Sequence, residues 1–344
     1  SPSLKAAKCC RIHFPRSSLT TSKYWGVTMN SHLKEDSRFS GVLTPVIMPY
    51  KTDYSPDADR LIKQCKWMLS QSVGLAIFGT NSEGNSLSTD EKIELMDRLL
   101  DAGIDTNKMM PGTGCCALTE TVKLTAHAIS LGCSGVLMLP PFFYKNVSDE
   151  GLYATYAEVI QRVGSSNLKI YLYHIPPVAN VPISQDLIER LVRDYPSTVV
   201  GIKDSSGDWS NTKAMLERQW DDFRVFVGSE TFLLANMQNG GSGCISATAN
   251  VNPAAIYELF ANWQSEKADD LQAELNDVRN TFSKFPLIPA LKQCVAHYAE
   301  DPDWARLRPP LLSLSSSQNS DLIEKLKVLD FKMPGLKVNS RATK

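Results

Sequence analysis

The chain has 344 residues, of which 43% are hydrophobic and 21% are charged, and its formal net charge is −1. This composition supports a sizeable folded core and argues against global disorder. It lacks the basic excess of a nucleic-acid-binding protein, and no apolar run approaches the length of a membrane span.

Residues 1–38 are rich in Lys, Arg, Ser and Thr and contain no acidic residue before Glu35. Such a composition is typical of an organellar transit peptide. The alternative is an over-extended reading frame, because Met29 lies shortly before the regular pattern begins. We favour this alternative and expect residues 1–38 to be disordered or not native. We therefore expect a cytoplasmic protein, and an organellar one only if this basic segment is native.

The eight cysteines show no Cys-x-x-Cys pair and no Cys/His cluster with zinc spacing, so we expect no metal site. They are Cys9, Cys10, Cys65, Cys115, Cys116, Cys133, Cys244 and Cys294. We interpret them as reduced thiols, mostly buried, in a reducing compartment.

One pattern recurs from Gly41 onward: a short apolar run, then polar or Gly-rich residues, then a segment of helical periodicity. The apolar runs predict strands at Val42–Met48, Gly74–Phe78, Met109–Gly112, Gly135–Leu139, Ile170–Tyr173, Val199–Ile202, Arg224–Val227 and Cys244–Ser246. Helices are predicted at Asp57–Ser70, Thr89–Ala102, Leu118–Leu131, Asp149–Val163, Ser184–Asp194, Trp209–Gln219, Thr231–Asn239 and Pro253–Glu266. Continuous apolar runs are typical of parallel strands that are covered on both faces.

Eight strand–helix units favour a closed (β/α)8 TIM barrel over a doubly wound sheet, because no GxGxxG motif follows the first strand. We place this α/β barrel at 39–266 and a C-terminal helical extension at 267–332, followed by a tail at 333–344. The extension has predicted helices at Lys267–Phe282, Pro289–Tyr298 and Ser320–Leu329. Active sites of TIM barrels lie at the carboxyl ends of the strands, so the residues that follow each apolar run are the functional candidates.

The second predicted strand ends in Gly79-Thr80-Asn81-Ser82-Glu83-Gly84. Backbone N–H groups of such a turn can form an anion-binding nest, and the Thr80 hydroxyl adds a donor. Because the lysine of a P-loop is missing, we do not expect a nucleotide. Taken alone, the motif also fits a plain turn that caps the next helix.

The fifth predicted strand ends in Tyr171-Leu172-Tyr173-His174. Alternation places Tyr171 and Tyr173 on one side of the strand, with Tyr173 nearer the carboxyl end. A phenol there can donate and accept a proton in turn, although an aromatic that only fills the barrel is the alternative. We expect His174 to pack under a loop.

The sixth predicted strand ends in Lys203-Asp204. A lysine in this place can reach solvent, form a structural ion pair, or act as an amine nucleophile that forms an imine with a carbonyl. The combination with the turn and the phenol favours the third possibility. We infer a pocket for a 2-oxo acid, with its carboxylate on Thr80–Asn81, its keto carbon facing Lys203 and Tyr173 moving protons.

Four ordered motifs resemble those of the dihydrodipicolinate synthase / N-acetylneuraminate lyase family over Phe39 to Leu312. They are Gly79-Thr80-Asn81-Ser82-Glu83, Tyr173-His174-Ile175-Pro176, Gly201-Ile202-Lys203-Asp204 and Gly243-Cys244-Ile245-Ser246. The resemblance implies a (β/α)8 barrel, usually a homotetramer, and a Schiff base with pyruvate or a related 2-oxo acid that needs no other cofactor.

The resemblance also implies a role for individual residues. Lys203 would be the imine-forming nucleophile and Tyr173 the proton relay. Thr80 and the Asn81 backbone would hold the carboxylate, and Thr80 would join the relay. Ile245 would contribute its backbone near the bound 2-oxo acid.

The sequence departs from the family pattern at three places. Val178 stands where dihydrodipicolinate synthases carry an arginine that grips the aldehyde carboxylate, and a valine cannot form that bidentate pair. Either Phe143 or Tyr144 takes the place of a tyrosine that such synthases bring from a neighbouring subunit. Asn81 and Ser82 replace the usual Thr-Gly of the carboxylate turn.

We therefore expect a class I lyase that acts on 4-hydroxy-2-oxoglutarate or on a 2-keto-3-deoxy sugar acid. Dihydrodipicolinate synthase, which joins pyruvate and aspartate semialdehyde, is the enzyme alternative. An inactive barrel that binds a 2-oxo acid is the alternative of another class, against which Lys203 and Tyr173 argue. The expected partners are a 2-oxo acid, an aldehyde and further copies of the chain, with no nucleic acid and no membrane.

Overall fold

A computed structural model of the chain describes residues 38–337. The expectations for residues 1–37 and 338–344 lie outside the described residues. Between these limits, no helix combines the length and the apolar character that crossing a membrane requires.

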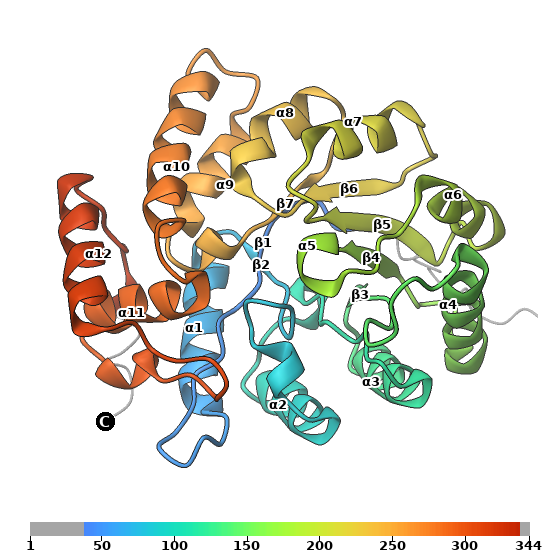
Figure 1. Cartoon of the computed structure of the whole chain (residues 1–344), viewed down its shortest axis with the longest axis horizontal. Helices are drawn as coiled ribbons and strands as arrows, with labels where there is room; N and C mark the ends of the chain where they lie inside the picture. The colour runs from blue at the N-terminus through green and yellow to red at the C-terminus, as the bar shows by residue number, and fades with distance from the viewer. Residues whose placement is uncertain (1–37, 338–344) are drawn as a thin grey trace, which may run out of the picture. The chain divides into compact units, whose positions relative to one another are not determined.

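The strands form one parallel sheet in the order β2-β1-β7-β6-β5-β4-β3. Their bounds are β1 Gly41–Thr44, β2 Gly74–Leu75, β3 Val136–Met138, β4 Ile170–His174, β5 Val199–Asp204, β6 Arg224–Val227 and β7 Gly243–Ile245. Each strand begins within one residue of the start of a predicted apolar run. The predictions for β1 and β2 were too long, because these strands end four and three residues before the predicted Met48 and Phe78. Figure 1 shows these strands in the centre, with helices around them.

The predicted strand Met109–Gly112 is not a regular strand in the structure. It forms two isolated parallel bridges instead, Leu75 with Met109 beside β2 and Gly112 with Leu137 in β3. Pro111 has no N–H to donate, which interrupts a regular ladder at this point. The segment still bridges β2 and β3, the first and last strands in the sheet order. The predicted (β/α)8 barrel is therefore confirmed, except that its third strand is irregular.

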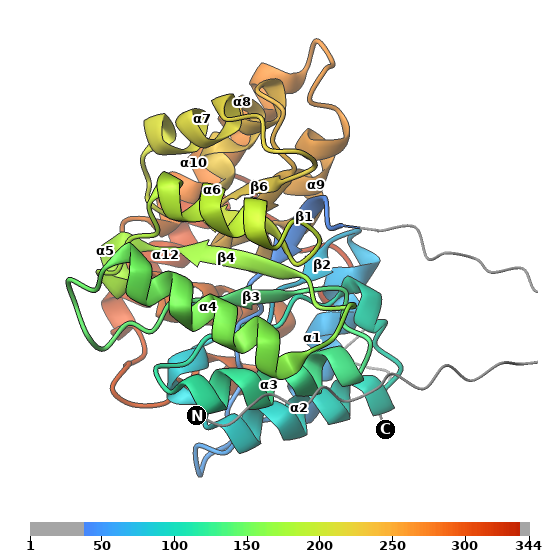
Figure 2. The same cartoon turned by 90° about the vertical axis from the view of Figure 1, so that its right-hand side faces the viewer.

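The barrel helices follow the strands in the predicted order. They are α1 Ala58–Ser70, α2 Thr89–Asp101, α3 Leu118–Ser130, α4 Asp149–Val163, α5 Pro176–Ala179, α6 Gln185–Asp194, α7 Trp209–Glu217, α8 Leu233–Gln238 and α9 Pro253–Ala261. Ser88 caps α2 in a capping box with Glu91, and Ser148 caps α4, as their sequences indicate. The short α5 was not predicted, and it lies at the carboxyl end of β4 (Figure 2).

Three further helices complete the described chain: α10 Ala268–Phe282, α11 Leu287–Ala299 and α12 Ser316–Val328. They lie together on one side of the barrel (Figure 1, orange to red). After α12 the chain returns to α1, where the Trp67 indole donates to the Pro334 carbonyl at 2.9 Å. Met333 and Leu336 are buried there and belong to the hydrophobic core.

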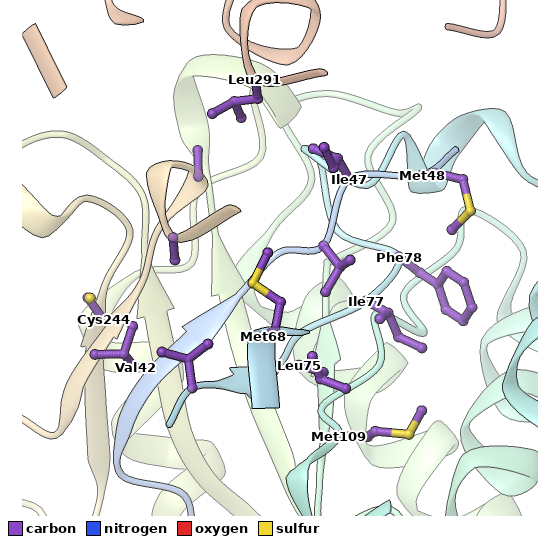
Figure 3. Packing of buried hydrophobic residues seen from close by; sticks show 14 of the residues in the cluster. Val42, Ile47, Met48, Met68, Leu75, Ile77, Phe78, Met109, Cys244 and Leu291 are labelled. Carbon is purple, nitrogen blue, oxygen red and sulfur yellow. The ribbon is translucent and has the colours of Figure 1, made fainter. Parts of the chain in front are cut away.

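The core has two layers. The larger cluster packs the helices on the outside of the sheet, and Figure 3 shows Met68 of α1 near Val42 of β1, with Cys244 of β7 alongside. A second cluster takes side chains from around the barrel: Leu43, Ala76, Met110, Leu137, Tyr171, Tyr173, Val200, Phe226 and Ile245. Burial of both layers removes apolar surface from water, which is the main term that stabilises the fold.

Tyr171 fills the barrel below the carboxyl ends of the strands. Its ring is flanked by Gly135 and Gly201, where an added Cβ would lie 2.6 Å from ring atoms. Glycine is therefore required at both positions for the ring to fit. The Tyr171 ring fills the barrel interior on the amino-terminal side of Tyr173 and Lys203. These two residues occupy the next layer, at the carboxyl ends of the strands.

Candidate active site

Lys203 and Tyr173 lie opposite each other on β5 and β4, as paired residues of adjacent strands. Both are 2% exposed. The Lys203 Nζ lies 3.3 Å from the Tyr173 hydroxyl oxygen and 4.4 Å from the centroid of the Tyr173 ring. The strand register thus places an amine and a phenol in contact at the carboxyl end of the barrel.

The surroundings of Lys203 decide between the roles open to a lysine at a strand end. Its burial excludes a side chain that extends into solvent. Within residues 38–337 it takes part in no ion pair, because Asp204 points elsewhere and accepts from the Thr212 hydroxyl at 2.7 Å and from the Asn211 amide at 3.1 Å. A buried amine without a carboxylate partner is costly to the fold, which is typical of a functional group.

Thr80 extends this pair into a chain of polar groups. Its Oγ1 lies 2.9 Å from the Tyr173 hydroxyl oxygen, and either oxygen can donate. Tyr173 thus contacts Lys203 on one side and Thr80 on the other. Such an arrangement can carry a proton between the amine and the pocket, because a hydroxyl donates and accepts at the same time.

The turn Gly79–Gly84 presents backbone donors next to these residues. Three of its N–H groups bond within the turn: Ser82 and Gly84 donate to the Gly79 carbonyl, and Glu83 to the Thr80 carbonyl. The N–H groups of Thr80 and Asn81 have no acceptor in the part of the chain that the structure describes. Two adjacent free donors at a pocket fit the carboxylate nest predicted from this motif.

Glu83 holds the turn in place. Its backbone is left-handed, with φ 53°, which is a strained conformation for a residue other than glycine. Its carboxylate accepts from the Lys292 Nζ of α11 and from the backbone N–H of Arg308 at 3.1 Å. The side chains of Glu83 and Lys292 are both fully buried. These contacts tie the turn to the C-terminal extension.

The buried pair also has shifted protonation equilibria. Burial lowers the pKa of Lys292 to about 8, and the negative charge of Glu83 opposes this shift. Burial likewise raises the pKa of Glu83, while Lys292 and Arg308 act to lower it. The sequence held one signal for this pair, a single lysine within the apolar helix Leu287–Ala299, but nothing in it identified the partner.

A cavity of about 260 Å³ opens above Lys203. Its lining consists of Thr80, Asn81, Tyr173, Ile175, Val178, Lys203, Asp204, Ser205, Gly207, Gly228, Ser229, Phe232, Ala247, Arg279 and Leu287. Pockets for drug-sized ligands measure about 300 to 1,000 Å³, so this one is suited to a small metabolite. The lining comes from the carboxyl ends of the strands, from the segments that follow them, including α5, and from α10 and α11.

The family model of the dihydrodipicolinate synthetase family matches residues 38–329. The chain belongs to this family. It is 31% identical over 281 residues to an uncharacterised DapA-like lyase of Chloroflexus aurantiacus, which covers 81% of this chain and 93% of the relative. The protein is accordingly a lyase.

Two solved structures have the same barrel. Dihydrodipicolinate synthase from Agrobacterium tumefaciens superposes with a TM-score of 0.79 at 29% identity, covering 85% of this chain and 99% of that one. A variant of the Sulfolobus solfataricus 2-keto-3-deoxygluconate aldolase superposes with a TM-score of 0.75 at 21% identity, covering 84% and 96%. At that identity the second similarity concerns the fold alone.

Of the other residues singled out from the sequence, Val178 lies on α5 and lines the cavity, where it is 61% exposed. Phe143 and Tyr144 are 72% and 74% exposed on the loop before α4 and do not line the cavity of their own chain. Their role across a subunit boundary stays a prediction. Ile245 is buried in the inner cluster, and the role of its backbone also stays a prediction.

His174 packs under the loop after β4, as expected. Its Nδ1 accepts from the Ile183 N–H at 3.0 Å, and the ring is buried. Burial lowers the pKa of His174, which favours a neutral ring that supports this loop.

No group of three or more His, Cys, Asp or Glu side chains that could hold a metal ion occurs in residues 38–337. Three polar residues of the cavity, Ser205, Ser229 and Arg279, were not predicted from the sequence. The two serines follow predicted strand ends and could have been found by that rule. Arg279 comes from α10, and no local pattern marked it.

Proposed function

We propose that the chain is a Schiff-base aldolase that joins pyruvate, or a related 2-oxo acid, to an aldehyde or cleaves the product. The observation that carries this proposal is Lys203, a buried amine with no ion-pair partner among the described residues and with a hydrogen bond to Tyr173. The free N–H groups of Thr80 and Asn81 support a carboxylate beside it.

In this mechanism the Lys203 amine attacks the keto carbon of the 2-oxo acid, and the keto oxygen leaves as water to give a protonated imine. A proton then leaves the adjacent carbon, which yields an enamine. That carbon attacks the carbonyl carbon of the aldehyde, whose oxygen takes up a proton. Water finally hydrolyses the imine and releases Lys203 and a 4-hydroxy-2-oxo acid. The imine itself withdraws electrons, so the proposal needs no separate cofactor.

Tyr173 is the group we assign to proton transfer in these steps. Its hydroxyl contacts Lys203 and Thr80 at 3.3 and 2.9 Å, so a proton can pass along the chain when water leaves or returns. The N–H groups of Thr80 and Asn81 would hold the carboxylate and fix the keto carbon in front of the amine.

Val178 supports a hydroxy-oxo-acid or 2-keto-3-deoxy sugar-acid substrate over aspartate semialdehyde. It lines the cavity at the place where the resemblance expects a carboxylate-binding arginine. The lysine-pathway synthase remains the second candidate, because the solved relative at 29% identity bears that name.

An acceptor panel with pyruvate separates these functions. We expect condensation with glyoxylate or glyceraldehyde at higher kcat/KM than with aspartate semialdehyde. A preference for aspartate semialdehyde would reverse the substrate assignment. The absence of both condensation and a pyruvate adduct would favour the inactive 2-oxo-acid-binding barrel.

The proposal includes a homo-oligomer. Phe143 and Tyr144 stack edge to face, with ring centroids 5.3 Å apart, and are largely exposed on one loop. Exposed neighbouring aromatics are typical of contact surfaces. Light scattering of the purified chain would test this, and a monomeric mass would contradict it.

A further inference from the structure

Arg279 of α10 lines the same cavity as Lys203. Its side chain is 18% exposed, so the guanidinium is largely enclosed but reaches the open space. Among the described residues that line the cavity, Lys203 and Arg279 are the two cations. Since Lys203 would be consumed in the imine, Arg279 is the positive charge that stays available to the rest of a bound substrate.

One side of the guanidinium is fixed by the protein. Its Nη1 donates to Glu230 Oε2 at 3.2 Å and to the Ser246 hydroxyl oxygen at 3.3 Å. Glu230 is 1% exposed, and its carboxylate also accepts from the hydroxyls of Ser246 and Thr248. Buried Glu230 and Ser246 therefore fix the position of the Arg279 guanidinium.

The other side of the guanidinium remains open. Neither Nε nor Nη2 has an acceptor in the described part of the chain. These two nitrogens form one edge of the planar group and donate in parallel. Two parallel donors on a fixed arginine match the two oxygens of a carboxylate.

We propose that Arg279 binds a carboxylate at the distal end of the aldehyde, and so selects acidic aldehydes over neutral polyhydroxy aldehydes. This inference rests on the proposed aldolase function. Val178 leaves the α5 side of the cavity without a cation, and Arg279 supplies one from the α10 side. The favoured product class is then a 4-hydroxy-2-oxo dicarboxylic acid.

A purely structural role for the Arg279–Glu230 ion pair makes a different prediction. In that case loss of Arg279 would lower stability and affect all aldehydes alike, because the pair would only hold α10 against the turn that follows β6. Acceptor selectivity therefore distinguishes the two roles, whereas loss of activity alone does not.

The experiment compares kcat/KM for pyruvate with glyoxylate, an acidic aldehyde, and for pyruvate with D-glyceraldehyde, a neutral one. The variants are Arg279→Gln, Arg279→Lys and the double variant Arg279→Gln/Glu230→Gln. The double variant leaves no buried unpaired carboxylate and keeps the test valid if Arg279→Gln does not fold. Arg190→Gln is the matched control, because Arg190 pairs with Glu150 on the surface away from the cavity.

We expect the glyoxylate-to-glyceraldehyde selectivity to fall about 10- to 100-fold in Arg279→Gln and in the double variant, mainly through KM for glyoxylate. Arg279→Lys should fall between these and the wild type, and Arg190→Gln should match the wild type. A wild type that prefers glyceraldehyde, or a selectivity that stays within about twofold in the variants, would overturn the inference.

Borohydride trapping of pyruvate, measured in the same samples, separates this inference from the proposed function. If pyruvate is trapped in the wild type and in the Arg279 variants but the acceptor selectivity does not change, only the role of Arg279 is contradicted. A wild type that traps no pyruvate contradicts the aldolase function itself.

Discussion

Lys292 of α11 and Glu83 of the turn Gly79–Gly84 form an ion pair in which both side chains are fully buried. The two residues are distant in the sequence, so the pair attaches the C-terminal extension to the turn that carries Thr80 and Asn81. Lys292 also donates to the Arg306 carbonyl at 2.8 Å, which is a second contact that fixes this region. The extension therefore takes part in shaping the candidate active site.

Replacement of Lys292 by methionine should destabilise the protein by about 3 to 5 kcal/mol, because it leaves the Glu83 carboxylate buried and unpaired. The turn should also lose its fixed conformation, and KM for pyruvate should rise. Urea unfolding and steady-state kinetics measure the two effects. The double variant Lys292→Met/Glu83→Gln should recover part of the stability. A single variant as stable as the wild type would show that the pair does not hold the turn.

Tyr173→Phe should lower kcat by about 100- to 10,000-fold, the usual contribution of a general acid–base group, while the fold stays intact. Thr80→Val should also lower kcat, since it removes the hydroxyl 2.9 Å from Tyr173, and Thr80→Ser should restore most of the rate. Circular dichroism checks the fold of each variant. A Tyr173→Phe enzyme with wild-type kcat would exclude the relay.

Glu91 should contribute to stability in a pH-dependent way. The hydrogen bond from Arg308 holds the pKa of Glu91 below its usual 4.5. Because the folded-state value is the lower one, this contribution is complete above pH 4.5 and is lost as the pH falls through the folded-state pKa.

The variant Glu91→Gln should therefore be less stable than the wild type at pH 7, with a difference that shrinks as the pH falls below 4.5. Urea unfolding over this pH range measures the difference. Asp59→Asn is the control, because that carboxylate is 80% exposed in its pair with Arg98. A Glu91→Gln difference that stays constant with pH would contradict the linkage.

Val178→Arg should raise kcat/KM for aspartate semialdehyde by about tenfold or more, because it places a guanidinium at the mouth of the cavity. Val178 is 61% exposed, so the longer side chain fits without disturbing the core. KM for pyruvate should not change. Equal use of aspartate semialdehyde before and after the substitution would show that this position does not select the aldehyde.

The positions of Lys203, Tyr173 and Thr80 could be predicted from the sequence, because each directly follows an apolar run and parallel strands end at one rim of a barrel. Because side chains alternate along a strand, the sequence also predicted that Tyr171 and Tyr173 lie on the same side of β4. The segment Met109–Gly112 was wrongly expected to be a regular strand, since its apolar pattern outweighed the missing N–H of Pro111.

Arg279 and Lys292 could not be assigned from the sequence in the same way. Both lie on helices of the C-terminal extension, and only the packing of that extension against the barrel brings them to the site. Local periodicity identifies such helices but does not tell which of their polar residues face a cavity.

The most direct test of the central claim is to incubate the protein with pyruvate, reduce it with borohydride, and locate the adduct by intact-mass and peptide mass spectrometry. We predict one covalently bound pyruvate per chain on the peptide that contains Lys203, and none in Lys203→Ala. An adduct on another lysine, or no adduct in the wild type, would contradict the assignment of Lys203 as the nucleophile.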